Sequence, residues 1–243
     1  MNISNNTILI TGGASGIGLG LTERFLKENN TVIICGRRAK LLQEISDKYP
    51  QVITRVCDLT DEGDRADLYN WVAENYSNVN VLINNAGIQQ WMDITDADFF
   101  SKAKQEIVTN IEAPLHLTSL FVKLPALKTV INVTSGLSFV PLTKVPVYSA
   151  TKAFFHSFTL SLRQLLAAKN IEVIEMVPPA LNTDLGGKGL HDAAPPVSAF
   201  IDSIFYQLKE NKEQLTFGFS AAMVSATPEE LDNTFKKMNS VAN

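Results

Sequence analysis

The stretch TILITGGASGIGLG, residues 7–20, decides the fold. It begins with a short apolar run, Ile8–Ile10, turns at Gly12 and Gly13, and continues as a helical pattern over residues 17–28. A strand, a glycine turn and a helix in this order predict the opening of a βαβ unit. Glycine suits such a turn because it tolerates a tight backbone and the close approach of a ligand. The free N–H groups and positive dipole end of the following helix predict a site for a pyrophosphate.

The glycine spacing of this stretch is Gly12-x3-Gly16-x-Gly18. It matches neither the G-x-G-x-x-G fingerprint nor the P-loop, which requires a lysine after its last glycine. Taken alone, the spacing is also compatible with an ordinary strand-to-helix turn that contains three glycines. The choice between a nucleotide site and such a turn depends on the rest of the chain.

The composition is that of a protein with a full hydrophobic core. Of the 243 residues, 45% are hydrophobic and 19% are charged, and the formal net charge is -4 without a charge run. These values are typical of soluble globular domains and argue against nucleic acid or a membrane as the main partner. No basic segment precedes the first apolar run, and no stretch approaches the ~20 apolar residues of a membrane span, so we expect a cytoplasmic protein. Cys35 and Cys57 are then expected to be free thiols.

Short apolar strands alternate with helical patterns along the chain, and no repeat or linker interrupts them. This alternation predicts one doubly wound α/β domain, residues 1–243, with a seven-stranded, mostly parallel sheet and helices on both faces. Right-handed crossovers bring the carboxyl ends of all strands to one edge, where ligands bind. The predicted strands are 8–10, 31–35, 52–56, 81–83, 129–133, 171–177 and 214–219; the predicted helices are 17–28, 39–48, 61–74, 98–122 and 148–169, with a capped helix start at Thr227.

Short motifs follow the predicted strand ends in a fixed order. Together they resemble the short-chain dehydrogenase/reductase family, in its branch of single-domain members near this length, over nearly the whole chain. The C-terminal segment 216–224 and the helix after it depart from the usual ending and resemble a subgroup of uncharacterised bacterial oxidoreductases. The motifs are TGGASGIG (11–18), CDL (57–59), NNAG (84–87), Asn110, Ser135, YSATK (148–152) and Pro178 with Thr183.

Tyr148 and Lys152 lie four residues apart at the start of a predicted helix, so they share a face. A phenol has a pKa of about 10 in water, which is too high for efficient proton exchange at neutral pH. A nearby ammonium favours the phenolate, and Tyr148 is therefore a candidate general acid or base. Without the other motifs, the two residues would be interpreted as an exposed helical pair.

The resemblance implies a nicotinamide-dependent enzyme that interconverts a carbonyl and an alcohol. It implies that Ser135 holds the substrate oxygen, that Lys152 binds the nicotinamide ribose and that Asn110 anchors a water in a proton relay. It also implies that Asp58 accepts from the adenine amino group and that Thr183 holds the nicotinamide carboxamide. The implied cofactor-binding residues are Gly12, Ser15, Gly16, Ile17, Gly18, Arg37, Arg38, Asp58, Leu59, Asn85, Ala86, Gly87, Tyr148, Lys152, Pro178 and Thr183.

One departure from the family pattern lies beside the expected nicotinamide site. The family usually has Pro-Gly where this chain has Pro178-Pro179. Proline has no N–H and a fixed φ, so a backbone donor or a flexible bend is lost there. We expect cofactor binding to survive and the approach of the substrate to differ.

The end of the second predicted strand indicates which dinucleotide is used. An NAD-specific site places Asp or Glu about 20 residues after the glycine turn, where it binds the ribose hydroxyls. Here that position falls in Cys35–Arg38, and no acid occurs between Glu28 and Glu44. Guanidinium groups bind phosphates strongly, so NADP(H) is predicted in preference to NAD(H). Arg37 is the main candidate for the 2′-phosphate, Ser15 adds a hydroxyl, and Arg38 is either a second contact or a solvated helix-start residue.

The substrate itself is not indicated beyond a small carbonyl or alcohol compound. The Gly/Pro-rich segment Asp184–Pro196 is longer than usual for an α/β connection and is predicted to be a substrate lid, with a disordered surface loop as the alternative. The other residues expected to contact the substrate are Gln89, Gln90, Trp91, Leu137, Phe139 and Pro141.

Other functions are less compatible with the sequence. A non-catalytic dinucleotide sensor on the same fold is the main alternative, because fold does not imply function, but it would not need Asn110, Ser135, Tyr148 and Lys152. No G-x-S-x-G elbow surrounds Ser135, which disfavours a hydrolase. The glycine spacing and short length disfavour a dehydratase or epimerase of the longer family branch. His116, His156 and His191 lack metal-ligand spacing, so packing or surface roles and no metal site are predicted.

The resemblance also implies an assembly in which the two long helices, 98–122 and 148–169, pack across a two-fold axis. We therefore predict a homodimer or homotetramer, with Phe155 and Leu162 on the outer helix face.

Overall fold

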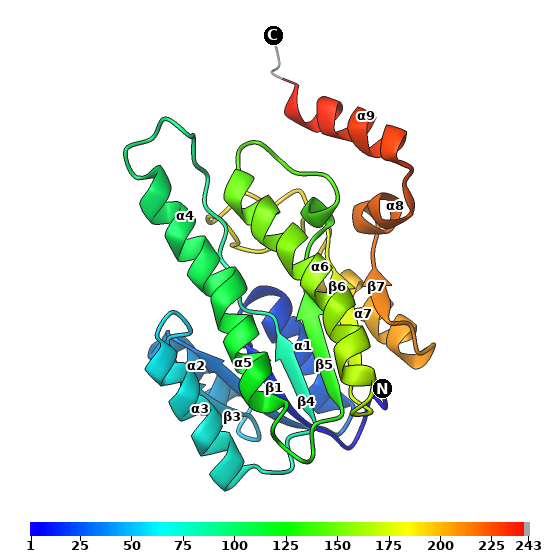
Figure 1. Cartoon of the computed structure of the whole chain (residues 1–243). Helices are drawn as coiled ribbons and strands as arrows, with labels where there is room; N and C mark the ends of the chain where they lie inside the picture. The colour runs from blue at the N-terminus through cyan, green and yellow to red at the C-terminus, as the bar shows by residue number, and fades with distance from the viewer. Residues whose placement is uncertain (241–243) are drawn as a thin grey trace.

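A single parallel sheet forms the centre of the molecule (Figure 1). The computed structural model describes residues 1–240, and the strand order is β3-β2-β1-β4-β5-β6-β7, with every neighbouring pair parallel. This confirms the predicted doubly wound α/β fold. The strands are β1 (Thr7–Thr11), β2 (Thr31–Gly36), β3 (Ile53–Val56), β4 (Val81–Asn84), β5 (Thr129–Val133), β6 (Glu172–Val177) and β7 (Gln214–Thr216).

Helices cover both faces of the sheet and form two hydrophobic cores. Successive side chains of β1 alternate between the cores, with Ile8 and Ile10 on one face and Leu9 on the other, all completely buried. This burial on both faces is why the inner strands are continuous apolar runs rather than alternating ones. One core is closed by α1 (Gly16–Lys27), α2 (Ala39–Lys48) and α7 (Val197–Lys209), and the other by α3 (Glu62–Asn75), α5 (Ala113–Phe121) and α6 (Pro146–Ala167).

Three elements differ from the sequence prediction. Helix α7 was not predicted, although its buried residues Phe200, Ile204, Phe205 and Leu208 follow a helical spacing and the Phe205 ring packs 4.7 Å from that of Phe25. Strand β7 ends at Thr216, because Gly218 takes a φ of 54° and the chain turns there into α8 (Phe219–Ser225). The predicted long helix 98–122 consists of α4 (Phe99–Ile107), a π-helical turn (Val108–Glu112) and α5.

The predicted outer face of α6 is also wrong. Phe155 and Leu162 are buried in the monomer, with 2% and 6% exposure, because they point toward the body of the molecule. The exposed large apolar residues of this helix are Phe154, at 44%, Leu160, at 46%, and Leu165, at 68%.

The chain ends with α9 (Pro228–Asn239), which lies beyond the edge of the sheet to which the arrow of β7 points (Figure 1, red). Thr227 and Glu230 form the predicted capping box, and no residue of α9 is buried. The Asn239 amide donates to the Pro141 carbonyl at 3.0 Å and accepts from Thr143 N at 2.7 Å, which attaches α9 to the loop before α6.

The last features of the fold are its cysteines and the apolar character of its helices. Cys35 and Cys57 are free thiols, as predicted. Within residues 1–240, no helix combines the length and the apolar character that crossing a membrane requires.

Candidate active site

The glycine turn after β1 leaves the first N–H groups of α1 open to a cleft. Gly12 and Gly16 have φ values of +66° and +51°, which side-chain-bearing residues rarely adopt. A Cβ on Gly18 would collide with the Gly12 carbonyl oxygen, so the helix approaches the strand end closely only with glycine here. Ser15 is the N-cap of α1 in an extended conformation. This backbone arrangement fits a pyrophosphate.

Positive charge gathers where β2 ends. Arg38 is the N-cap of α2, and its guanidinium donates to the Ser15 hydroxyl at 2.9 Å, which links this strand end to the glycine turn. The pKa of Asp58 is lowered, chiefly because Thr60 donates its backbone N–H and its hydroxyl to the carboxylate, with a smaller contribution from Arg37. Arg38 is exposed, and its bond to Ser15 holds its guanidinium beside the glycine turn.

The turn after β4 is attached to the end of β1. The Thr11 hydroxyl oxygen accepts from the backbone N–H groups of Asn85 and Ala86, both at 3.0 Å. The Asn85 amide donates to the Thr11 carbonyl at 2.9 Å. A Cβ on Gly87 would lie 3.3 Å from Asn110 Oδ1 and 3.5 Å from Lys152 Nζ. The backbone of Gly87 therefore packs closely against both side chains, and a larger residue here would crowd them.

The proposed catalytic side chains meet above the ends of β4 and β5. Tyr148 and Lys152 lie in the first two turns of α6, which begins with Pro146 at its first position. Lys152 Nζ donates to the Val133 carbonyl at 2.8 Å and lies 5.7 Å from the centroid of the Tyr148 ring. Ser135 follows β5, and its hydroxyl accepts from Leu137 N at 3.1 Å. All three side chains are at least nine-tenths buried.

The expected lowering of the Tyr148 pKa is wrong for this structure. Burial raises the pKa of Tyr148 to about 12, and the negative charge of Glu106 adds to the rise, whereas the Ser135 hydroxyl opposes it. Burial also lowers the pKa of Lys152 to about 8. Removal from water is the largest cause of both shifts, so the phenol keeps its proton at neutral pH.

Asn110 lies behind the cleft rather than in its wall. It sits in the π-helical turn between α4 and α5, where its Oδ1 accepts from Ile88 N and its Nδ2 donates to the Ile88 carbonyl, both at 2.9 Å. A second bond at 3.2 Å joins Nδ2 to the Thr151 hydroxyl on α6. The amide side chain thus holds the loop after β4 against α6, and the predicted role in anchoring a water stays a prediction.

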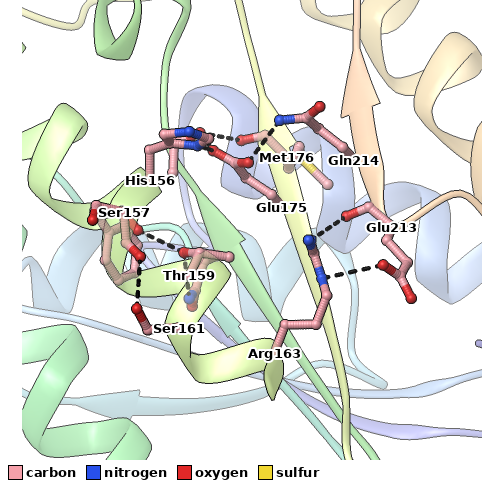
Figure 2. Close-up of polar contacts among 12 residues, drawn as sticks. His156, Ser157, Thr159, Ser161, Arg163, Glu175, Met176, Glu213 and Gln214 are labelled. Atoms are coloured by element: carbon pink, nitrogen blue, oxygen red, sulfur yellow. Dashed lines mark hydrogen bonds and ion pairs between the residues drawn. The ribbon is translucent and has the colours of Figure 1, made fainter. Parts of the chain in front are cut away.

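A buried polar network fixes α6 relative to β5. Figure 2 shows the His156 ring and the Gln214 amide directed at the fully buried Glu175 carboxylate, at 2.8 and 2.9 Å. The Thr134 hydroxyl, next to Ser135, also donates to this carboxylate at 2.7 Å. The network joins the strand end that carries Ser135 to the helix that carries Tyr148, and it gives His156 the predicted packing role.

One cleft of about 1620 Å³ runs along the carboxyl edge of the sheet. Every predicted cofactor-binding residue lines it, and so does Ser135, while Asn110 alone of the predicted set does not. Gln89, Gln90, Leu137 and much of the segment 184–196 line the substrate end.

Three residues expected to contact the substrate lie outside this cleft. Trp91 is 49% exposed, and the Lys144 ammonium lies 5.0 Å from its ring centroid. Phe139 packs on His156 with a centroid distance of 4.7 Å. Pro141 presents its carbonyl to α9. Trp91, Phe139 and Pro141 therefore face surroundings other than the cleft that was expected to hold the substrate.

The C-terminal region supplies cleft residues that were not predicted. Phe217 and Phe219, on either side of the turn into α8, line the cleft, as does Met238 of α9. On α4, Lys104 and Gln105 also contribute. The sequence indicated only that segment 216–224 departs from the usual family ending. It did not indicate that side chains of this segment face the cleft.

Comparison with known proteins agrees with this geometry. The short chain dehydrogenase family model matches residues 6–193. The uncharacterised oxidoreductase DltE of Bacillus subtilis is 41% identical, and the match covers 100% of both chains. The chain belongs to the short-chain dehydrogenase/reductase family. It is therefore an oxidoreductase that depends on a nicotinamide dinucleotide, and its resemblance to uncharacterised bacterial oxidoreductases is confirmed.

Solved structures match this short-chain dehydrogenase/reductase over nearly its whole length. A short chain dehydrogenase from Burkholderia cenocepacia in complex with NADP has a TM-score of 0.85 and 24% identity, covering 99% of this chain and 100% of its own. A relative from Burkholderia phymatum in complex with NAD has a TM-score of 0.82 and 14% identity, covering 100% and 98%. At these identities the likeness shows the fold. The glycine cradle, the helix N-terminus and the two arginines of this chain fit a dinucleotide.

Proposed function

We propose that this protein is an NADP(H)-dependent oxidoreductase that interconverts a carbonyl and an alcohol on a small substrate, with Tyr148 as the general acid and base. The observation that carries the proposal is the convergence of Ser135, Tyr148 and Lys152 at one end of the cleft whose other end is the glycine turn. A dinucleotide sensor would need the glycine turn but no buried proton donor.

The residues have distinct roles in the proposed reaction. Residues of the glycine turn and the strand ends would hold NADPH in the cleft, where the cofactor would supply the hydride for the carbonyl carbon. Tyr148 donates its proton to the substrate oxygen as that oxygen becomes an alkoxide, and the Ser135 hydroxyl holds the same oxygen. The Lys152 ammonium stabilises the phenolate that remains. The Tyr148 phenol is protonated at neutral pH, which is the form that a proton donor in carbonyl reduction requires.

The preference for NADP(H) rests on Arg37, Arg38 and the absence of an acid between Glu28 and Glu44. Both arginines line the cleft, and Arg38 is already bonded to Ser15 of the glycine turn. Guanidinium groups at this end would bind a 2′-phosphate by charge-assisted hydrogen bonds. The NADP complex of the Burkholderia cenocepacia relative supports this assignment.

Segment 184–196 is proposed as a substrate lid. Asn182 N donates to the Pro195 carbonyl at 2.9 Å, and the Asn182 amide donates to the Asp192 carbonyl at 3.2 Å. These bonds close the base of the loop, while Leu185, Gly186 and His191 line the cleft. A loop held at its base can move at its tip, as lids do.

We also propose that the protein forms a homodimer or homotetramer through α4, α5 and α6. The exposed Phe154 and Leu165 of α6 and the exposed Phe100 of α4, at 78%, are apolar side chains that a partner would cover.

The test is an assay of NADPH and NADH oxidation with a panel of aldehydes and ketones, with Tyr148→Phe as the matched variant. We expect at least one carbonyl to be reduced with NADPH, and we expect Tyr148→Phe to lower kcat by at least about 100-fold with little change in cofactor affinity. Cofactor binding without reduction of any carbonyl would favour the sensor, and an active Tyr148→Phe variant would refute the mechanism.

A further inference from the structure

A fully buried carboxyl lies next to the candidate active site. Glu106 is on the inner face of α4, one turn before Asn110, and none of its surface is exposed. Burying a carboxyl is unfavourable unless it is hydrogen-bonded or protonated. Most inward positions of helices in this protein are apolar, so the position requires a specific explanation.

The contacts of Glu106 join it to the wall of the cleft. Gln90 N donates to Glu106 Oε1 at 2.6 Å, and within residues 1–240 Oε2 has no hydrogen-bond partner. Asn110, four residues on, binds both backbone polar groups of Ile88. Asn110 and Glu106, which lie on the same helix face, therefore hold Ile88 and Gln90 respectively. Both belong to the segment 87–90, which lines the cleft beside Lys152.

The charge of Glu106 makes a small contribution to the raised pKa of Tyr148, after burial and the Ser135 hydrogen bond. Helix α6 packs against α4, and Tyr148 is the ionisable group of α6 whose protonation Glu106 influences. Lys152 is directed at the Val133 carbonyl, His156 at Glu175 and Arg163 at the Val173 carbonyl.

The segment before α4 adds no opposing charge at Glu106. In that segment, the Asp93 carboxylate accepts from Thr95, and Asp98 pairs with Lys102 at 3.0 Å. Lys144, in the loop before α6, has its ammonium over the Trp91 ring.

We propose that Glu106 is a positioning residue of this active site, which holds the 87–90 segment through Gln90 and, when ionised, keeps the proton on the Tyr148 hydroxyl. The inference rests on the proposed function of Tyr148 as the proton donor. A negative charge near the phenol disfavours the phenolate, so it preserves the acid form needed for carbonyl reduction at alkaline pH. Burial raises the pKa of Glu106 to about 7, so this charge appears as the pH rises above neutrality.

Two substitutions separate the contact from the charge. Glu106→Gln keeps a side-chain oxygen that accepts from Gln90 N and removes the charge. Glu106→Leu removes both. Glu112→Gln is the matched control, because it removes the same charge from an exposed position in the adjacent π-helical turn.

The first measurement is the pH dependence of kcat/KM for carbonyl reduction. For Glu106→Gln we expect the alkaline limb to move to lower pH by about 0.3 units, a twofold change in proton affinity, with an unchanged KM for the carbonyl. For Glu106→Leu we expect the same shift and a raised KM. A Glu106→Gln profile that superimposes on those of the wild type and Glu112→Gln overturns the proposal.

The second measurement does not depend on turnover. Phenolate absorbance is titrated over the range in which the far-ultraviolet circular dichroism stays native, and the Tyr148→Phe signal is subtracted. Ionisation of Tyr148 is expected to begin at lower pH in Glu106→Gln than in the wild type. An unchanged titration overturns the role of Glu106 even if carbonyl reduction is demonstrated, whereas an active Tyr148→Phe enzyme refutes the proposed function instead.

Discussion

The buried Glu106 carboxyl predicts how the stability of the protein depends on pH. The pKa of Glu106 rises from 4.5 to about 7 on folding, because the side chain is removed from water. Between these values the folded state holds a proton that the unfolded state has released. The free energy of unfolding therefore falls as pH rises from about 4.5 to about 7, and the full stability is present only below that range.

The size of this effect follows from the shift. One pKa unit is worth about 1.4 kcal/mol, so the shift corresponds to about 3 kcal/mol. The Glu106 oxygen that accepts from Gln90 N faces a half-buried loop. Solvent screening there reduces the expected change in the free energy of unfolding to about 2 kcal/mol. The side chain introduced by Glu106→Gln does not titrate, so the variant lacks this pH-dependent contribution to the free energy of unfolding. The difference in unfolding free energy, variant minus wild type, should accordingly be about 2 kcal/mol more positive at pH 8 than at pH 5.

Urea unfolding followed by circular dichroism at the two pH values measures this difference, with Glu112→Gln as the control. Taking the difference between pH values cancels any packing change that the substitution introduces at both. Parallel pH dependence of the wild type and Glu106→Gln would show that Glu106 is ionised in the folded protein at pH 5, and that the account of its burial is mistaken.

Three further predictions concern cofactor, framework and assembly. The enzyme should prefer NADPH over NADH by at least about 10-fold in kcat/KM, and Arg37→Asp should erode or invert the ratio in steady-state assays; equal use of both by the wild type would contradict this. Glu175→Ala should lower the free energy of unfolding in urea by about 3 kcal/mol, because it removes the buried acceptor that Thr134, His156 and Gln214 share, whereas the exposed Glu213→Ala should cost less than about 1 kcal/mol. Light scattering should give at least a dimer mass at micromolar concentration and a smaller mass for Leu165→Lys; a monomeric wild type would refute the interface.

Local signals were sufficient for most of the sheet and for the cofactor end of the cleft. The inner strands are short apolar runs bounded by polar, glycine or proline residues, and residue patterns of this kind depend little on tertiary context. The motif residues from Gly12 to Thr183 line one cleft because the parallel topology brings all strand ends to one edge.

The remaining features depend on which way a side chain faces, and no local pattern specifies this. The apolar residues of α6 surround much of the helix, so Phe155 and Leu165 could not be assigned to the inner and outer faces from their spacing. Phe219 has a high strand propensity, yet a turn at Gly218 places it at the start of α8. The Tyr148 pKa depends on burial and on Glu106, which is 42 positions away in the chain and looks like an ordinary helix-surface acid in the sequence.

The central claim is that hydride passes to a carbonyl carbon while Tyr148 supplies the proton. The most direct measurement is a turnover with NADPH that carries two deuterons at nicotinamide C4, followed by mass spectrometry of the alcohol. We predict that the wild type forms an alcohol with one deuteron on the carbinol carbon, and that Tyr148→Phe forms it at least about 100-fold more slowly. An alcohol without deuterium, or equal rates for the two proteins, would contradict the account.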